Sequence, residues 1–172
     1  MKMVHIWSIL EALLNVRRNN MFTLEDVRKE YDRLDALLGI DTKNVELKIS
    51  KGFRTAGLFQ VKRDKKTNDL KMIIRINKVV FNCCEDSFFE IIRHEYAHAA
   101  NYIINKDKAD AHGPKWKAIS KKVGCSCAIH VIEGSDVHEL LSRERSTYRS
   151  KNKKPFDWDE YLEEIGRQFE QS

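Results

Sequence analysis

The spacing of apolar residues changes twice along this 172-residue chain, and these changes limit the folds it can adopt. Up to about residue 39 the apolar residues recur every three or four positions, as on one face of an α-helix. Between about residues 45 and 77 they alternate with polar residues, as in strands that bury one face. Helical spacing returns at about residue 85. The pattern predicts an α+β fold with one small sheet between helical segments.

Two helices are predicted before the sheet. The first covers about residues 1–17. The second begins after Thr23, whose side chain can cap it in a capping box with Asp26, and it ends at Gly39. Three strands follow, at residues 45–49, 57–62 and 70–76, and a polar turn precedes the last of them. Their simplest arrangement is a three-stranded antiparallel meander.

The second half of the chain is predicted to be helical. An amphipathic helix should occupy residues 85–105, and after a polar connector another should begin near Pro114 and end at Gly124. A short helix near residues 137–141 and an amphipathic helix over 158–169 complete the prediction. We expect one globular unit over residues 1–135 and a basic, helical extension over 136–172.

The predicted helix over residues 85–105 carries the motif HExxH. His94 and His98 stand four residues apart, so both imidazoles project from one side of the helix and can reach one metal ion, with Glu95 beside them. Neutral imidazole is a good ligand for Zn²⁺, which lowers the pKa of a bound water to about 7. Glu95 is then the candidate general base. The alternative is two surface histidines flanking a glutamate in a salt bridge.

A catalytic zinc site needs a third protein ligand. Metzincins place a glycine and a histidine later in the same motif, but Asn101 and Ile104 occupy those positions here, which excludes that class. Gluzincins use a glutamate from a later helix, for which Glu133 and Glu139 are candidates. His112 is the better candidate, because it precedes Gly113 at the mouth of the next helix and a short connector could return its ring to the metal. Its alternative role is a surface histidine at a helix start.

Two runs of residues resemble a known family: HEYAHAA at 94–100, followed after the connector by HGPKW at 112–116. They resemble the SprT-like metallopeptidases, the group that includes the bacterial SprT proteins and Spartan-type DNA–protein crosslink proteases. The resemblance implies a zincin-like fold, Zn²⁺ held by His94, His98 and His112, and Glu95 as the catalytic residue. It also implies that an extended protein substrate can add to a sheet edge beside the metal.

The chain departs from this family in its cysteines. Many relatives carry a zinc ribbon after the catalytic core, whereas no cysteine follows Cys127 in this sequence. Cys125, Cys127 and His130 are too closely spaced for a closed metal site, so we expect plain thiols and a surface histidine. The clustering of the cysteines also favours reduced thiols, in the cytoplasm or, in a eukaryote, the nucleus.

The net charge of +5 favours a polyanionic partner. DNA is therefore a candidate partner beside the protein substrate, and a solvated basic surface is the alternative. The candidate nucleic-acid-binding residues lie in the predicted turn between strands and in the basic stretch over 143–154; they are Arg63, Lys65, Lys66, Arg149, Lys151, Lys153 and Lys154. No apolar run is long enough for a membrane span, residues 4–14 make a poor signal peptide, and a monomer is expected.

Three functions are consistent with these features. The first is a zinc endopeptidase that acts on proteins, including proteins on DNA. The second is a catalytically silent module of zincin fold that binds nucleic acid or protein. The third is a zinc hydrolase of another amide, because attack by an activated water does not distinguish acyl substrates.

Overall fold

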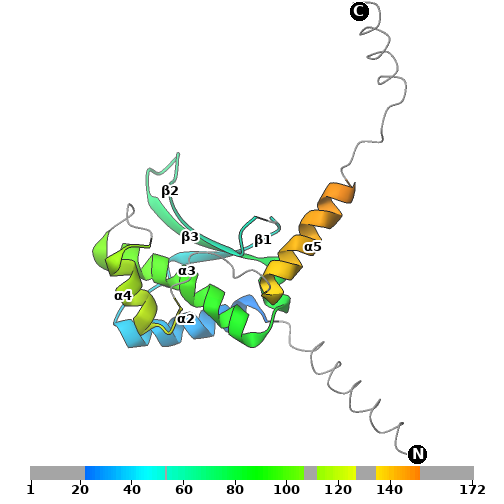
Figure 1. Ribbon diagram of the computed structural model, residues 1–172. Coiled ribbons are helices and arrows are strands. Elements are labelled where there is room, and N and C mark those ends of the chain that lie inside the picture. Colours follow the sequence, from blue (N-terminus) through cyan, green and yellow to red (C-terminus); the bar gives the residue numbers. More distant parts are fainter. Residues whose placement is uncertain (1–21, 53, 107–111, 127–134, 152–172) are drawn as a thin grey trace, which may run out of the picture.

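The computed structural model describes residues 22–52, 54–106, 112–126 and 135–151. Its elements, labelled as in Figure 1, are α2 (Leu24–Leu38), β1 (Val45–Ser50), β2 (Gly57–Arg63), β3 (Leu70–Asn77), η1 (Lys78–Asn82), α3 (Glu85–Asn105), α4 (Pro114–Lys122) and α5 (Asp136–Lys151). The predicted α+β class is confirmed. The predicted helices over 1–17 and 158–169 lie outside the described residues.

Helix α2 has the ends predicted for it. The Thr23 backbone N–H donates to the Asp26 carboxylate over 2.8 Å, while the Asp26 N–H donates to the Thr23 hydroxyl over 3.3 Å. At the other end Gly39 has a φ of 66°, the left-handed conformation that glycine adopts without steric cost. Between these caps Tyr31 and Leu34 are fully buried and attach the helix to the core.

The predicted antiparallel meander is wrong. The strand order is β1-β3-β2, with β1 parallel to β3 and β2 antiparallel to β3. After β1 the chain passes the end of β3 and forms β2 at the opposite edge of the sheet. Asn77, the last residue of β3, stabilises this connection. Its side-chain amide donates to the carbonyls of Gly52 and Thr55, and its backbone N–H donates to the Ala56 carbonyl over 2.7 Å. Alternation of apolar residues predicts which face of a strand is buried, but it does not predict the neighbouring strand.

Helix α3 is the centre of the molecule. It lies below the sheet in Figure 1, packs against β2, β3 and α4, and buries an apolar face that includes Phe88, Ile92 and Tyr96, as expected for an amphipathic helix. Two tyrosine hydroxyls attach it to α2: Tyr31 donates to the Ile92 carbonyl over 3.0 Å, and Tyr96 donates to the Asp35 carboxylate over 2.8 Å. The helix that carries HExxH is therefore fixed in position.

Helix α5 is longer than the short helix predicted. Only Val137 and Leu141 of its residues are buried, so most of its length has no apolar stripe from which a helix could be predicted. Its first residue, Asp136, accepts hydrogen bonds from the Cys84 N–H and the Ser87 hydroxyl at the start of α3. The first turns of α5 thus belong to the same core as α2, the sheet, α3 and α4, and the predicted division at residue 135 stays a prediction.

Candidate metal centre

Three histidines from two helical segments converge at one place. His94 and His98 lie one turn apart on α3, and His112 lies directly before Gly113, the N-cap of α4, with Pro114 at the first helical position. The Nε2 atoms of His98 and His112 lie 3.1 Å and 3.3 Å from the Nε2 of His94. One donor atom from each of the three rings lies within 4.8 Å of the other two. The group can therefore hold a metal ion.

The spacing of these nitrogens fits a tetrahedral Zn²⁺ site. Zn–N bonds of about 2.0–2.1 Å at tetrahedral angles place two ligand nitrogens roughly 3.3 Å apart, which matches the observed 3.1 Å and 3.3 Å. A neutral imidazole nitrogen can make one hydrogen bond, as donor or acceptor, so Nε2 of His94 cannot satisfy both neighbours in this way. A shared cation accepts the lone pairs of all three.

The environment keeps His98 in the form that binds metal. Burial, together with the neighbouring His94 and His112, lowers the pKa of His98 to about 3. His98 is consequently neutral at physiological pH, and neutral imidazole is the metal ligand.

Trp116 forms the inner wall of the site. It is fully buried, and its ring centroid lies 4.9 Å, 5.1 Å and 4.7 Å from those of His94, His98 and His112. Among the described residues its indole N–H has no hydrogen-bond acceptor. Trp116 therefore supports the rings by packing, which limits the positions they can adopt.

Glu95 lies next to the histidines but is turned towards the sheet. It is 6% exposed, and burial raises its pKa to about 8, although a hydrogen bond from the Phe59 backbone N–H acts in the opposite direction. The Glu95 side chain packs on Gly57, the first residue of β2. Burial thus favours the neutral form of this carboxyl group in the metal-free protein.

Among the described residues, the other candidate ligand, Glu139, does not join this group. Asn101 accepts a hydrogen bond from Asn105, and Ile104 is 48% exposed, which agrees with the exclusion of a metzincin. Glu139 pairs with Arg143 on α5 and is not among the described residues that gather at the histidines. Glu133 lies outside the described residues.

Cys125 has a structural contact. It is buried at the end of α4, where its thiol lies 3.3 Å from the Glu90 carboxylate. The same carboxylate accepts from the Ser126 N–H over 2.8 Å, which attaches the end of α4 to α3. Cys127 and His130 lie outside the described residues, so their expected roles as a plain thiol and a surface histidine stay predictions.

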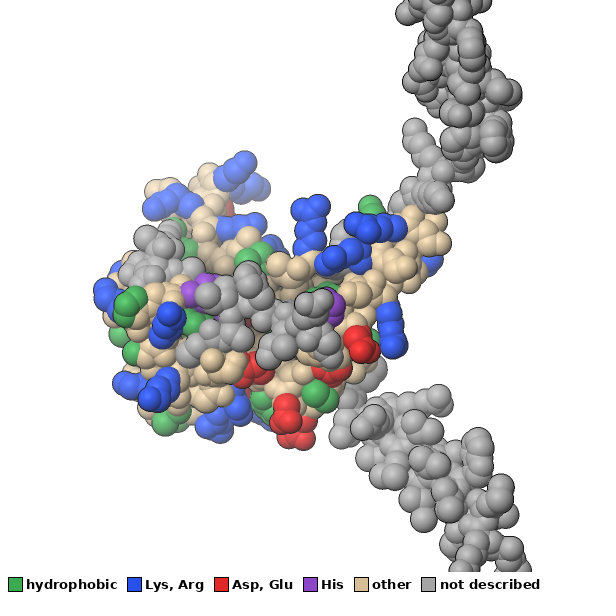
Figure 2. All heavy atoms as spheres, viewed as in Figure 1, with side chains coloured by type: hydrophobic (Ala, Val, Ile, Leu, Met, Phe, Trp, Pro, Cys, Tyr) green, Lys and Arg blue, Asp and Glu red, His purple; other side chains and the backbone are tan. Residues whose placement is uncertain are grey.

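Those predicted basic residues that the structure describes lie in two separate places, the β2–β3 hairpin and α5. Figure 2 shows Lys and Arg side chains standing on the β2–β3 hairpin and along α5. Arg63 donates to the Asn68 carbonyl over 2.9 Å and so helps to close the hairpin turn. Of the predicted basic residues, Arg63, Lys65 and Lys66 on the hairpin and Arg149 and Lys151 on α5 are exposed. Lys153 and Lys154 lie outside the described residues, and the nucleic-acid role stays a prediction.

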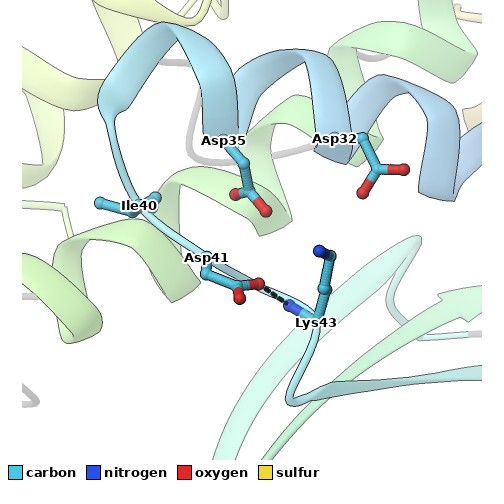
Figure 3. A pocket seen from close by; sticks show the side chains of 5 residues that line it. All are labelled: Asp32, Asp35, Ile40, Asp41 and Lys43. Atoms are coloured by element: carbon cyan, nitrogen blue, oxygen red, sulfur yellow. Dashed lines mark hydrogen bonds between the residues drawn. The ribbon is translucent and has the colours of Figure 1, made fainter.

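A hollow elsewhere on the surface lies between the end of α2 and the start of β1 (Figure 3). It is lined by Asp32, Asp35, Ile40, Asp41 and Lys43. Asp35 already accepts hydrogen bonds from the Tyr96 hydroxyl and from the N–H and hydroxyl of Thr42. The acidic side chain at its centre therefore has a structural role.

The fold and site together define an α+β protein with a group of three histidines that can hold a metal ion, and with a buried glutamate next to one of them in sequence. A model of the SprT-like family matches residues 24–138, more than half of the chain. The chain belongs to the SprT-like family. Neither the curated proteins nor the solved structures compared with the chain gave a match. Within the described ranges, no helix combines the length and apolarity needed to cross a membrane.

Two residues of the site were not predicted from the sequence. Trp116 belongs to the run 112–116 that follows the connector, but nothing in the run indicates that its ring packs on the three histidines, because His112 lies before the helix. Gly57 was assigned only to a strand. The sequence carries no signal for its contact with Glu95, because that contact joins residues 38 positions apart in different elements.

Proposed function

We propose that this protein is a zinc metalloendopeptidase. The observation that carries the proposal is the convergence of His94, His98 and His112 with their nitrogens at zinc-ligand spacing, together with the buried Glu95 that follows His94 in the sequence. Membership of the SprT-like family supports the same activity. When bound, Zn²⁺ supplies Lewis-acid polarisation of the scissile carbonyl and activates a water for attack.

The side chains have separate roles in the proposal. The three imidazoles hold the ion through their neutral nitrogens. Glu95, as the carboxylate, takes the proton from the attacking water and transfers it to the leaving amine. Trp116 packs against the ligand rings and restricts their positions, so that the coordination geometry does not depend on the substrate.

Strand β2 is the proposed docking edge for the substrate. It is an edge strand of the sheet, it lies against α3, and its Phe59 N–H reaches Glu95. An extended peptide that paired with this edge would place a backbone carbonyl close to the histidines, and pairing through the backbone is tolerant of sequence. A peptide is therefore the proposed substrate, rather than another amide.

The proposal extends to protein substrates on DNA. It is supported by the net charge of +5 and by the exposed lysines and arginines of the hairpin and α5. The proposed location is the cytoplasm, or the nucleus in a eukaryote, since Cys83 and Cys84 are thiols and form no disulfide.

The test compares the zinc-loaded wild type with Glu95→Gln on a protein substrate, with and without DNA. Glu95→Gln should keep stoichiometric zinc and lose about 10²- to 10⁴-fold in kcat, the usual contribution of a general base. Glu85→Gln is the matched control, because it removes an exposed carboxylate from the same helix and should leave kcat unchanged.

Two results would contradict the enzyme. Equal hydrolysis by the wild type and Glu95→Gln would show that Glu95 is not the general base. Stoichiometric zinc without hydrolysis under any of these conditions would favour a catalytically silent binding module.

A further inference from the structure

Gly57 lies against the carboxyl group of Glu95. It is the first residue of β2, paired with Ile76 of β3, and Glu95 reaches it from α3. A Cβ atom built on Gly57 would lie 2.5 Å from the Glu95 Cγ, 2.5 Å from its Oε1 and 2.7 Å from its Cδ. Non-bonded carbon atoms pack at about 3.5–4.0 Å. No side chain larger than hydrogen fits while Glu95 stays in place.

Backbone conformation does not explain this glycine. Among the described glycines, those with positive φ are Gly39 and Gly124, so Gly57 adopts a conformation open to other residues. Its location in the β2–β3 ladder also accepts most residue types. The close approach of Glu95 is the constraint at this position.

A side chain at residue 57 would move Glu95 rather than the strand. The start of β2 is held by its pairing with β3 and by the 2.7 Å hydrogen bond from the Asn77 N–H to the Ala56 carbonyl. Glu95 ends in a carboxyl group that can rotate, but it is 6% exposed and has little room. The displaced carboxyl group would also leave the Phe59 N–H, which donates to it in this position.

We propose that Gly57 is a positioning residue for Glu95: the missing side chain at this edge-strand position determines where the carboxyl group lies relative to the three histidines. The inference rests on the proposed function of Glu95. Strand β2 would then have two roles: it would dock the substrate, and through Gly57 it would determine the position of the general base.

The contact itself is tested on metal-free protein, without reference to activity. Gly57→Ala is compared in the wild type and in Glu95→Ala, which lacks the atoms that a Cβ at residue 57 would meet. The urea midpoint should fall on Gly57→Ala in the wild type and fall clearly less in the Glu95→Ala background. An equal or larger fall in that background overturns the inference. Gly52→Ala is the matched control, since a Cβ there meets nothing within 4 Å.

The effect on catalysis is tested on zinc-loaded protein. A displacement of about 1 Å in a catalytic group can cost roughly 100-fold, so Gly57→Ala should lower kcat by about that factor. The zinc stoichiometry should be unchanged, and KM should stay within about twofold of its original value. Gly52→Ala should change neither constant. A rise in KM with kcat unchanged would assign Gly57 to substrate docking and overturn the inference.

The two proposals fail in different ways. If the wild type shows no hydrolysis that depends on Glu95, the proposed function is wrong, and the urea experiment still decides whether Gly57 and Glu95 are coupled. If the wild type is active through Glu95 and Gly57→Ala retains its kcat, the positioning role is wrong while the enzyme stands.

Discussion

The metal centre and the basic surface of this protein are built in opposite ways. At the metal centre, Trp116 and Glu95 are buried and the ligand nitrogens are separated by 3.1 Å and 3.3 Å. On the basic surface, Lys65 and Lys66 at the hairpin and Arg149 on α5 extend into solvent. Chemistry at a metal needs positions fixed within fractions of an ångström, whereas attraction of a polyanion needs only charge of the right sign.

The comparison teaches where single substitutions should matter. Each side chain of the metal centre has several packed neighbours, so its loss changes the positions of the rest. Each exposed charge acts through screened electrostatics and can be replaced by its neighbours. We therefore expect large, specific effects at the centre and small, salt-dependent effects on the surface.

The largest effect is expected at the third ligand. His112→Ala should abolish stoichiometric zinc binding, with a decrease in affinity greater than the roughly 10- to 100-fold that removal of a supporting residue costs. Metal analysis after dialysis measures it. His138→Ala, on α5, is the control and should keep its zinc. Full zinc occupancy in His112→Ala would show that the ligand set is wrong.

The second-largest effect is expected at Trp116, which packs against the three histidine rings. Trp116→Ala should lower the free energy of unfolding by about 3–5 kcal/mol, as for other buried tryptophans, because Trp116 is fully buried and packs on all three rings. Urea unfolding of the metal-free protein gives the value. Tyr148→Ala provides the contrast, because Tyr148 is 53% exposed and should cost well under 1 kcal/mol. Similar losses of unfolding free energy in both variants would contradict the expected difference between the metal centre and the exposed surface.

The free energy of unfolding should depend on pH because of the buried Glu95 carboxyl group. In the folded, metal-free protein burial raises the pKa of Glu95 from its ordinary 4.5 to about 8. Between these values the folded state binds more protons than the unfolded state, so this contribution to stability is lost as the pH rises. Relative to Glu95→Gln, the metal-free wild type should lose on the order of 1–2 kcal/mol between about pH 5 and about pH 7.

The comparison with Glu95→Gln isolates this titration. The lowered pKa of His98 gives a slope of the opposite sign below its ordinary value of 6.5, and that slope is present in both proteins. Urea unfolding at several pH values measures the difference. Parallel stability curves would mean that Glu95 titrates as an exposed carboxyl group does.

The smallest effects are expected on the basic surface. Neutralising Lys65 and Lys66 together should weaken binding to DNA modestly and lower the salt slope by up to about 1 for each phosphate that the variant no longer neutralises. Titration of a labelled oligonucleotide at several salt concentrations measures both quantities. Lys29→Gln is the control, because Lys29 pairs with Glu25 on α2. An unchanged salt slope in the double variant would show that Lys65 and Lys66 neutralise no DNA phosphate and are only part of a solvated surface.

Local signals in the sequence predicted the local structure well. The capping box at Thr23, the apolar face of residues 85–105 and Pro114 before Trp116 placed the helices α2, α3 and α4. These signals succeed because caps and helical periodicity act over three or four residues. The exposed length of α5 carried no such signal and was missed.

The sequence by itself determined the chemical set: two histidines one turn apart, a glutamate beside them and a third histidine at the start of the next helix. Only the tertiary structure decided that β3 lies between β1 and β2, and that β2 lies against Glu95 through Gly57. Ligand spacing along a helix is a property of a few consecutive residues. The neighbour of a strand depends instead on how distant segments pack, which alternation of apolar residues cannot encode.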